Sequence, residues 1–90
     1  MAEISITPGE LRSVAATFKQ KSAESTQMIS QLEGQVSSMQ PSFRGMTSEK
    51  FYNDFTEWRS QMKHFTQLLD GIATELEHIA TKFEETDRTH

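Results

Sequence analysis

Apolar and small residues recur along the chain at alternating intervals of four and three positions, in two long stretches. The first stretch extends from residue 11 to residue 39. The second, in which every position of the series is apolar, extends from residue 51 to residue 83. Intervals that average about 3.5 residues place side chains on one face of an α-helix, whereas a β-strand requires alternation with period two. The pattern therefore predicts an all-α protein with two long helices.

The same two series predict which side chains form the interior of the hairpin and of its dimer. In the first helix this predicted core consists of Leu11, Ala15, Phe18, Ser22, Ser25, Ile29 and Leu32. In the second helix it consists of Phe55, Trp58, Met62, Phe65 and Leu69. Because Ala15, Ser22 and Ser25 are small, the two backbones should approach closely there, while the large side chains of the second helix fill the gaps.

Capping and turn residues indicate where the helices begin and end. Thr7 and Glu10 form a capping-box pattern, in which the Thr7 hydroxyl accepts from the Glu10 amide and the Glu10 carboxylate accepts from the Thr7 amide. Pro41 cannot continue the first helix, and acidic side chains near the end of the second oppose its dipole. We expect a single domain over residues 1–90, with helices at about 8–40 and 47–85, a loop at about 41–46 and a frayed tail at 86–90.

A short loop brings the two helices back antiparallel, with a crossing angle near 20°. One hairpin has only one seam, so part of each apolar series would stay exposed to water. A second hairpin would cover that surface. The predicted fold is therefore an antiparallel helical hairpin that dimerises into a four-helix bundle, most simply as a two-fold homodimer.

Composition and charge narrow the range of partners. The 90 residues carry a formal net charge of −4 and no cysteine, which excludes disulfides and zinc-thiolate sites. Acidic proteins are poor ligands for nucleic acids and anionic membranes, and the aromatic residues have no interleaved basic residues. The whole net charge lies in residues 70–90, which is either a solvated acidic end or a recognition tail for a basic surface.

Residues with catalytic or metal-binding chemistry are scattered. His64 and His78 are two heptads apart, about 21 Å along a helix, which is too far for one metal ion. No metal-binding or nucleophile motif is present, and a long helical bundle has no water-excluded cleft. We expect neither an enzyme nor a bound metal or cofactor. The N-terminus has no signal-peptide pattern, and no apolar run is long enough to span a membrane.

The chain resembles the WXG-motif family, the EsxA-like substrates of type VII secretion, and in particular its homodimeric Gram-positive members. The resemblance rests on the length, on the two heptad-bearing helices and on the aromatic-x-Gly turn Phe43-Arg44-Gly45, which stands where the family has Trp-x-Gly. Trp58 lies in the second helix and is not a substitute for that tryptophan. The resemblance implies a helical hairpin that pairs with a second hairpin.

The resemblance also implies an export signal. The family carries Tyr-x-x-x-Asp/Glu after the second helix, and the similar segment here begins with Phe83 and ends with Asp87. In the family this signal lies beside the partner's turn, so Phe43, Gly45, Phe83 and Asp87 would together form a patch for the FtsK/SpoIIIE-type secretion ATPase. Because Phe83 also continues the heptad series, its alternative role is that of a final core residue.

The function predicted from this resemblance is export as a folded dimer, acting as an effector or as a co-secreted carrier. The protein would be cytoplasmic before export and secreted without a signal peptide. A heterodimer with another WXG-type protein is a further possibility for the pairing. The alternative function is a cytosolic helical adaptor or chaperone that binds a partner hairpin. Stable membrane insertion is disfavoured because the polar faces are mixed and net acidic.

Overall fold

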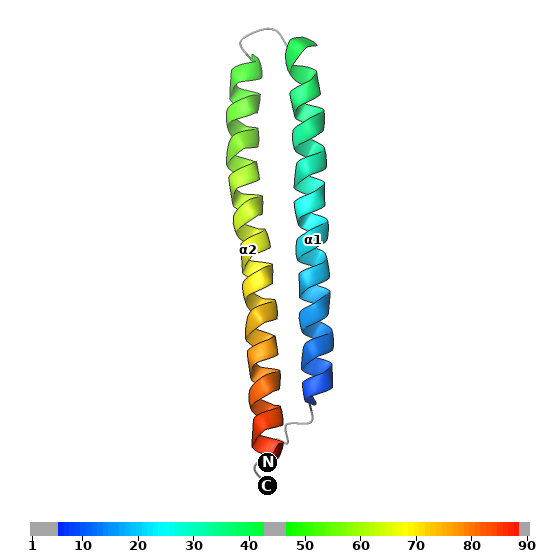
Figure 1. Cartoon of the computed structure of the whole chain (residues 1–90). Helices are drawn as coiled ribbons and strands as arrows, with labels where there is room; N and C mark the ends of the chain where they lie inside the picture. Colours follow the sequence, from blue (N-terminus) through cyan, green and yellow to red (C-terminus); the bar gives the residue numbers. More distant parts are fainter. Residues whose placement is uncertain (1–5, 43–46, 89–90) are drawn as a thin grey trace.

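The computed structural model folds the chain into two long antiparallel helices that lie side by side (Figure 1). It describes residues 6–42 and 47–88, with the backbone alone at residues 47, 87 and 88. Helix α1 spans Pro8–Met39, a short 3-10 turn η1 spans Gln40–Ser42, and helix α2 spans Thr47–Arg88. No strand occurs within the described ranges. The molecule is a rod with extents of 70 × 23 × 17 Å.

The start of α1 is fixed by the capping residues that the sequence indicated. Thr7 is extended, with φ −102° and ψ 158°, and its hydroxyl accepts a hydrogen bond of 3.1 Å from the Glu10 amide. The second half of the cap differs from the expected box, because the Glu10 carboxylate accepts from the Thr7 hydroxyl and not from the Thr7 amide. The first helical hydrogen bond runs from the Leu11 amide to the Thr7 carbonyl at 3.0 Å.

Substituting Thr7 with alanine is expected to destabilise the hairpin by about 0.5 to 2 kcal/mol, because the Glu10 amide loses the hydroxyl that accepts its hydrogen bond. The loss would appear as a lower midpoint in urea unfolding at fixed protein concentration. Thr7→Ser keeps the hydroxyl and serves as the control. A Thr7→Ala midpoint equal to that of Thr7→Ser would show that this cap contributes nothing.

Small side chains dominate the seam between the helices. Leu11, Ala15, Ser22 and Ile29 of α1 are buried, together with Ala73 and Ala80 of α2. No large side chain among the described residues is fully buried. The Ser22 hydroxyl donates to the backbone carbonyl of Thr66 at 3.4 Å, so α1 lies directly on the backbone of α2 at this point. The two helices therefore approach each other closely, but few large side chains are buried between them.

The seam on α2 differs from the apolar series on which the prediction was based. Its most buried residues are Ala73 and Ala80, which lie one position after Ile72 and Ile79 in the sequence. Ile72 and Ile79 are exposed instead. Helix α2 is therefore rotated about its own axis relative to the predicted orientation. Its alanines face the small residues of α1, and its larger side chains lie along the edge of the seam.

The helix boundaries also differ in detail from the sequence-based expectation. Helix α2 continues to Arg88, past the end expected at about 85. Helix α1 ends at Met39, and the chain passes through the η1 turn at Pro41 before the region 43–46, which lies outside the described residues. The turn residues Phe43 and Gly45 therefore have no structural description.

Candidate functional site

Large apolar side chains are exposed along one side of the hairpin, which we call the apolar face. Its most exposed members on α2 are Phe65, at 46%, and Leu68, at 53%. The exposed large apolar residues of this face are Val14, Met28 and Met39 on α1 and Phe51, Phe65, Leu68, Ile72 and Ile79 on α2. Large apolar side chains that are exposed on one side of a small protein are typical of an interaction site.

An apolar groove lies in the middle of this face, where the two helices meet. The groove has a volume of about 420 Å³ and is lined by Lys21, Glu24, Ser25, Met28, Phe65 and Leu69. Ser25 is the small residue of this set, and its size leaves room between the larger side chains. At the rim, the Lys21 ammonium and the Glu24 carboxylate form an ion pair of 3.3 Å. Such a hole between two helices fits a side chain from a third helix.

Aromatic side chains cluster at the loop end of α2. The Phe51 and Phe55 rings are stacked with centroids 6.4 Å apart, and Phe55 stacks on Trp58 at 5.4 Å. Tyr52 meets Phe51 edge to face at 5.3 Å. Stacked and edge-to-face contacts of this kind add stability beyond the buried area. The cluster stiffens the first turns of α2, immediately after the aromatic-x-Gly turn in the sequence.

Charged side chains connect the helices on the other side of the seam. Arg12 pairs with Glu84, and the Lys19 ammonium lies 3.8 Å from the Glu77 carboxylate. Nearer the loop, Arg59 donates to the Glu33 carboxylate at 3.0 Å. The hairpin thus has one apolar and one polar side, and only the apolar side offers the hydrophobic area that stable association requires.

One ion pair within α2 shifts a pKa. Lys50 donates a hydrogen bond of 2.9 Å to the Asp54 carboxylate one turn later, and this bond, helped by the negative charge, raises the pKa of Lys50. Both side chains are exposed, so the pair lies away from the seam and contributes little to stability.

The structure places the predicted core residues at three levels of burial. Those that are buried are Leu11, Ala15, Ser22 and Ile29. Those that are half-buried are Phe18, Ser25, Leu32, Phe55, Trp58, Met62 and Leu69. Phe65 is exposed on the apolar face. The half-buried residues lie between the seam and the apolar face, where a second hairpin would complete their burial.

The residues of the predicted export patch are described only in part. Phe83 is half-buried near the end of α2. Phe43 and Gly45 lie outside the described residues, as does the side chain of Asp87, whose backbone is helical. The proximity of these four residues therefore stays a prediction.

The described part of the chain holds neither a candidate metal-binding group nor a candidate membrane-spanning helix. Its His, Asp and Glu side chains form no group of three that could hold a metal ion. Its helices contain no segment of the length and hydropathy needed to cross a membrane. The apolar face is thus the principal candidate site in this part of the molecule.

A rod of two antiparallel helices with one apolar and one charged side belongs to the class of small helical hairpins. The family model described as "Proteins of 100 residues with WXG" (WXG100) matches residues 3–88. The chain belongs to this family.

Relatives and solved structures agree with this assignment. The ESAT-6-like protein SAG1039 of Streptococcus agalactiae is 32% identical over 87 residues, which cover 97% of this chain and 91% of that protein. The type VII secretion system extracellular protein A of Staphylococcus aureus is 26% identical and covers 98% of this chain and 91% of its own length. The crystal structure of the secreted protein EsxB from Bacillus anthracis has a TM-score of 0.85 at 40% identity, over 97% of this chain and 99% of that one.

Proposed function

We propose that this protein is an EsxA-like substrate of a type VII secretion system and is exported as a folded pair of hairpins. The observation that carries the proposal is the match to the WXG100 family over residues 3–88, nearly the whole chain. The similar Staphylococcus aureus protein is a type VII secretion system extracellular protein, and the similar Bacillus anthracis protein is secreted. Outside the cell, the pair would act as an effector or as a co-secreted carrier.

The apolar face supports a pair as the exported form. Dimerisation is a property of the EsxA- and EsxB-like hairpins, and this chain leaves Phe65, Leu68 and Ile72 exposed where such a partner would bind. We assign the second position to another copy of the same chain, because one self-complementary face is sufficient for a two-fold dimer. In light scattering of the pure protein, a mass of about twice 10.3 kDa would support this assignment. A stable mass of 10.3 kDa would instead indicate a different WXG-type partner.

The proposal extends to the signal that the secretion machine reads. Phe83 and Asp87 on α2 would form a patch with Phe43 and Gly45 of the partner's turn, and an FtsK/SpoIIIE-type ATPase would bind it. Support comes from the half-burial of Phe83 near the end of α2, which leaves part of its ring accessible. The helix also continues to Arg88, so residues 83 and 87 are one turn apart on the same face.

Phe83→Ala and Asp87→Asn are each expected to reduce export about tenfold, because the loss of one aromatic or charged contact weakens recognition by more than 1 kcal/mol. The measurement is the ratio of protein in the medium to protein in the cells, in a host with a type VII system and in the same host without its ATPase. Lys82→Ala, at the neighbouring position, is the control.

A structural role for Phe83 would give a different result. If Phe83 is only a final core residue, Phe83→Ala lowers the thermal midpoint of the purified protein, while Asp87→Asn is exported normally. Phe83→Tyr, which restores the phenol of the family signal, should be exported at least as well as the natural chain. The cytosolic adaptor is not favoured, and retention of the natural chain in the cells of the host with the type VII system would be the result that supports it.

A further inference from the structure

The polar side of the hairpin carries two facing rows of residues, one on each helix, which together we call the charge row. Within each helix the members are seven residues apart, so they lie on one face of that helix. On α1 the row consists of Arg12, Lys19, Thr26 and Glu33, and on α2 the facing row consists of Glu84, Glu77, Asp70 and Lys63. Opposite charges therefore face each other at every level except one.

The exception is the level of Thr26 and Asp70, where the row on α1 has a hydroxyl and not a cation. Toward the start of α1, the ion pairs Arg12–Glu84 and Lys19–Glu77 connect the two helices. On the other side, Glu33 accepts from Arg59 and shares a groove with Lys63. At the exceptional level Asp70 has no cation opposite, and it makes no ion pair or hydrogen bond with any residue that the structure describes.

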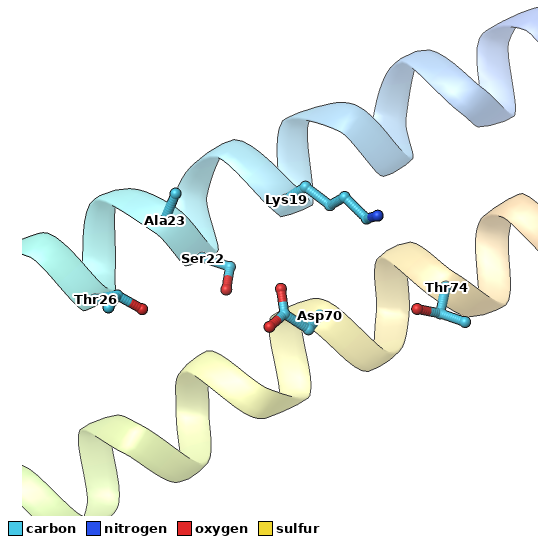
Figure 2. Close-up of a pocket in the computed structure, with 6 residues that line it drawn as sticks. All are labelled: Lys19, Ser22, Ala23, Thr26, Asp70 and Thr74. Atoms are coloured by element: carbon cyan, nitrogen blue, oxygen red, sulfur yellow. The ribbon is translucent and has the colours of Figure 1, made fainter.

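A groove opens at this level, and we call it the Asp70 groove. It has a volume of about 560 Å³ and is lined by Lys19, Ser22, Ala23, Thr26, Asp70 and Thr74. Figure 2 shows the Asp70 carboxylate reaching from α2 toward Ser22 on α1, with Thr26 and Thr74 on either side. The three small or short α1 residues, Ser22, Ala23 and Thr26, leave the space above the carboxylate open.

Two of the hydroxyl groups at this groove, those of Thr26 and Thr74, have no hydrogen-bond partner among the residues that the structure describes. Of the threonines whose side chains are described, Thr7, Thr17, Thr56, Thr66, Thr81 and Thr86 each make a hydrogen bond within the chain. Thr26 and Thr74 are the remaining two, and both line the Asp70 groove. A carboxylate and two hydroxyls with free acceptor capacity thus lie together between the helices.

We propose that the Asp70 groove binds a lysine side chain of a partner protein. An ammonium has three donors and one positive charge, which match one carboxylate and two hydroxyl acceptors. Its aliphatic stem would lie along Ala23 and the methyl groups of the threonines. Lys19 does not fill the groove, because its ammonium pairs with Glu77. In Figure 2 the Lys19 side chain extends past Asp70 toward the Thr74 turn.

The position of the groove makes it available to a second partner. It lies on the polar side of the seam, whereas Ser25, Met28, Phe65 and Leu69 line the groove of the apolar face. A pair formed through the apolar face would leave the Asp70 groove of each copy exposed. The proposal therefore goes beyond export and gives the folded pair two identical sites for a lysine-bearing protein.

The direct test is an NMR titration of the isotope-labelled protein with the peptide acetyl-Ala-Lys-Ala-amide. The amide and methyl signals of Ser22, Thr26, Asp70 and Thr74 should shift, and the same peptide with norleucine in place of lysine should not shift them. Asp70→Asn, which keeps the shape of the side chain, is expected to reduce these shifts by about fivefold or more. Equal shifts around Glu57 and Glu75, or shifts that Asp70→Asn leaves unchanged, would overturn the proposal.

A second test fills the groove from within the chain. Thr26→Lys supplies the missing cation of the charge row and is expected to raise the thermal midpoint by about 1 to 5 °C. It should also abolish the peptide-dependent shifts. Thr26→Val, which removes the hydroxyl without adding charge, is the matched control and should not raise the midpoint. If Thr26→Lys leaves the peptide shifts intact, the peptide binds outside this groove and the proposal is overturned.

Discussion

Replacing Ser22 with phenylalanine is expected to lower the free energy of unfolding by roughly 1 to 3 kcal/mol, because the new ring has no space in the seam. Ser22 is 4% exposed, and its hydroxyl lies 3.4 Å from the Thr66 carbonyl. Helix α1 therefore lies against the backbone of α2, which cannot move aside as a flexible side chain would. The helices would have to separate along several turns to admit the ring.

The measurement for this variant is urea unfolding followed by circular dichroism, at several protein concentrations because pairing contributes to stability. Ala23→Phe is the matched control. It introduces the same ring one position later, where the side chain is exposed on the polar side. If both variants unfold at the midpoint of the natural chain, the seam does not pass through Ser22.

Phe65→Asp is expected to weaken pairing by a factor on the order of 10² to 10⁴ while leaving the single hairpin folded. The Phe65 side chain is 46% exposed in the hairpin, so its burial is completed only by a partner. Full burial of such a side chain contributes about 1.5 to 3 kcal/mol. A two-fold dimer contains two copies of Phe65, so the substitution loses this contribution twice. Light scattering over a dilution series should show the mass falling from about twice 10.3 kDa to 10.3 kDa.

His64→Asp is the matched control for pairing, since it adds the same charge at the adjacent position. His64 is exposed, and it lies outside both the apolar face and the seam. This variant should keep the mass and helicity of the natural protein. Dissociation by both variants alike would point to general charge repulsion, and dissociation by neither would move the pairing surface away from Phe65.

The architecture was accessible from the sequence because local signals and the apolar series agree. The Thr7 and Glu10 cap begins α1 at Pro8, and the 3.5-residue series predicts two helices and a hairpin. The rotation of α2 was not accessible in this way. Ala73 and Ala80 are weakly apolar, so the series passed through their larger neighbours Ile72 and Ile79, although close helix packing favours the alanines in the seam.

The functional surfaces were predictable to different degrees. Phe65, Trp58 and Leu69 were expected in the interior of the pair, and the structure places them on or beside the apolar face. The charge row was missed because its facing positions are 30 to 72 residues apart in the sequence, and only the antiparallel packing brings Arg12 to Glu84. Its one signal was the seven-residue spacing of charges on each helix, which can be recognised once the register of the hairpin is known.

The elongated shape of the hairpin determines how the free protein behaves on a sizing column. A compact globule of this length has a radius of gyration of about 12 Å, whereas the two-helix rod has 20.3 Å. A globular protein would need roughly 350 residues to reach that radius. A lone hairpin therefore elutes like a much heavier globular protein, and its elution volume by itself imitates that of an oligomer.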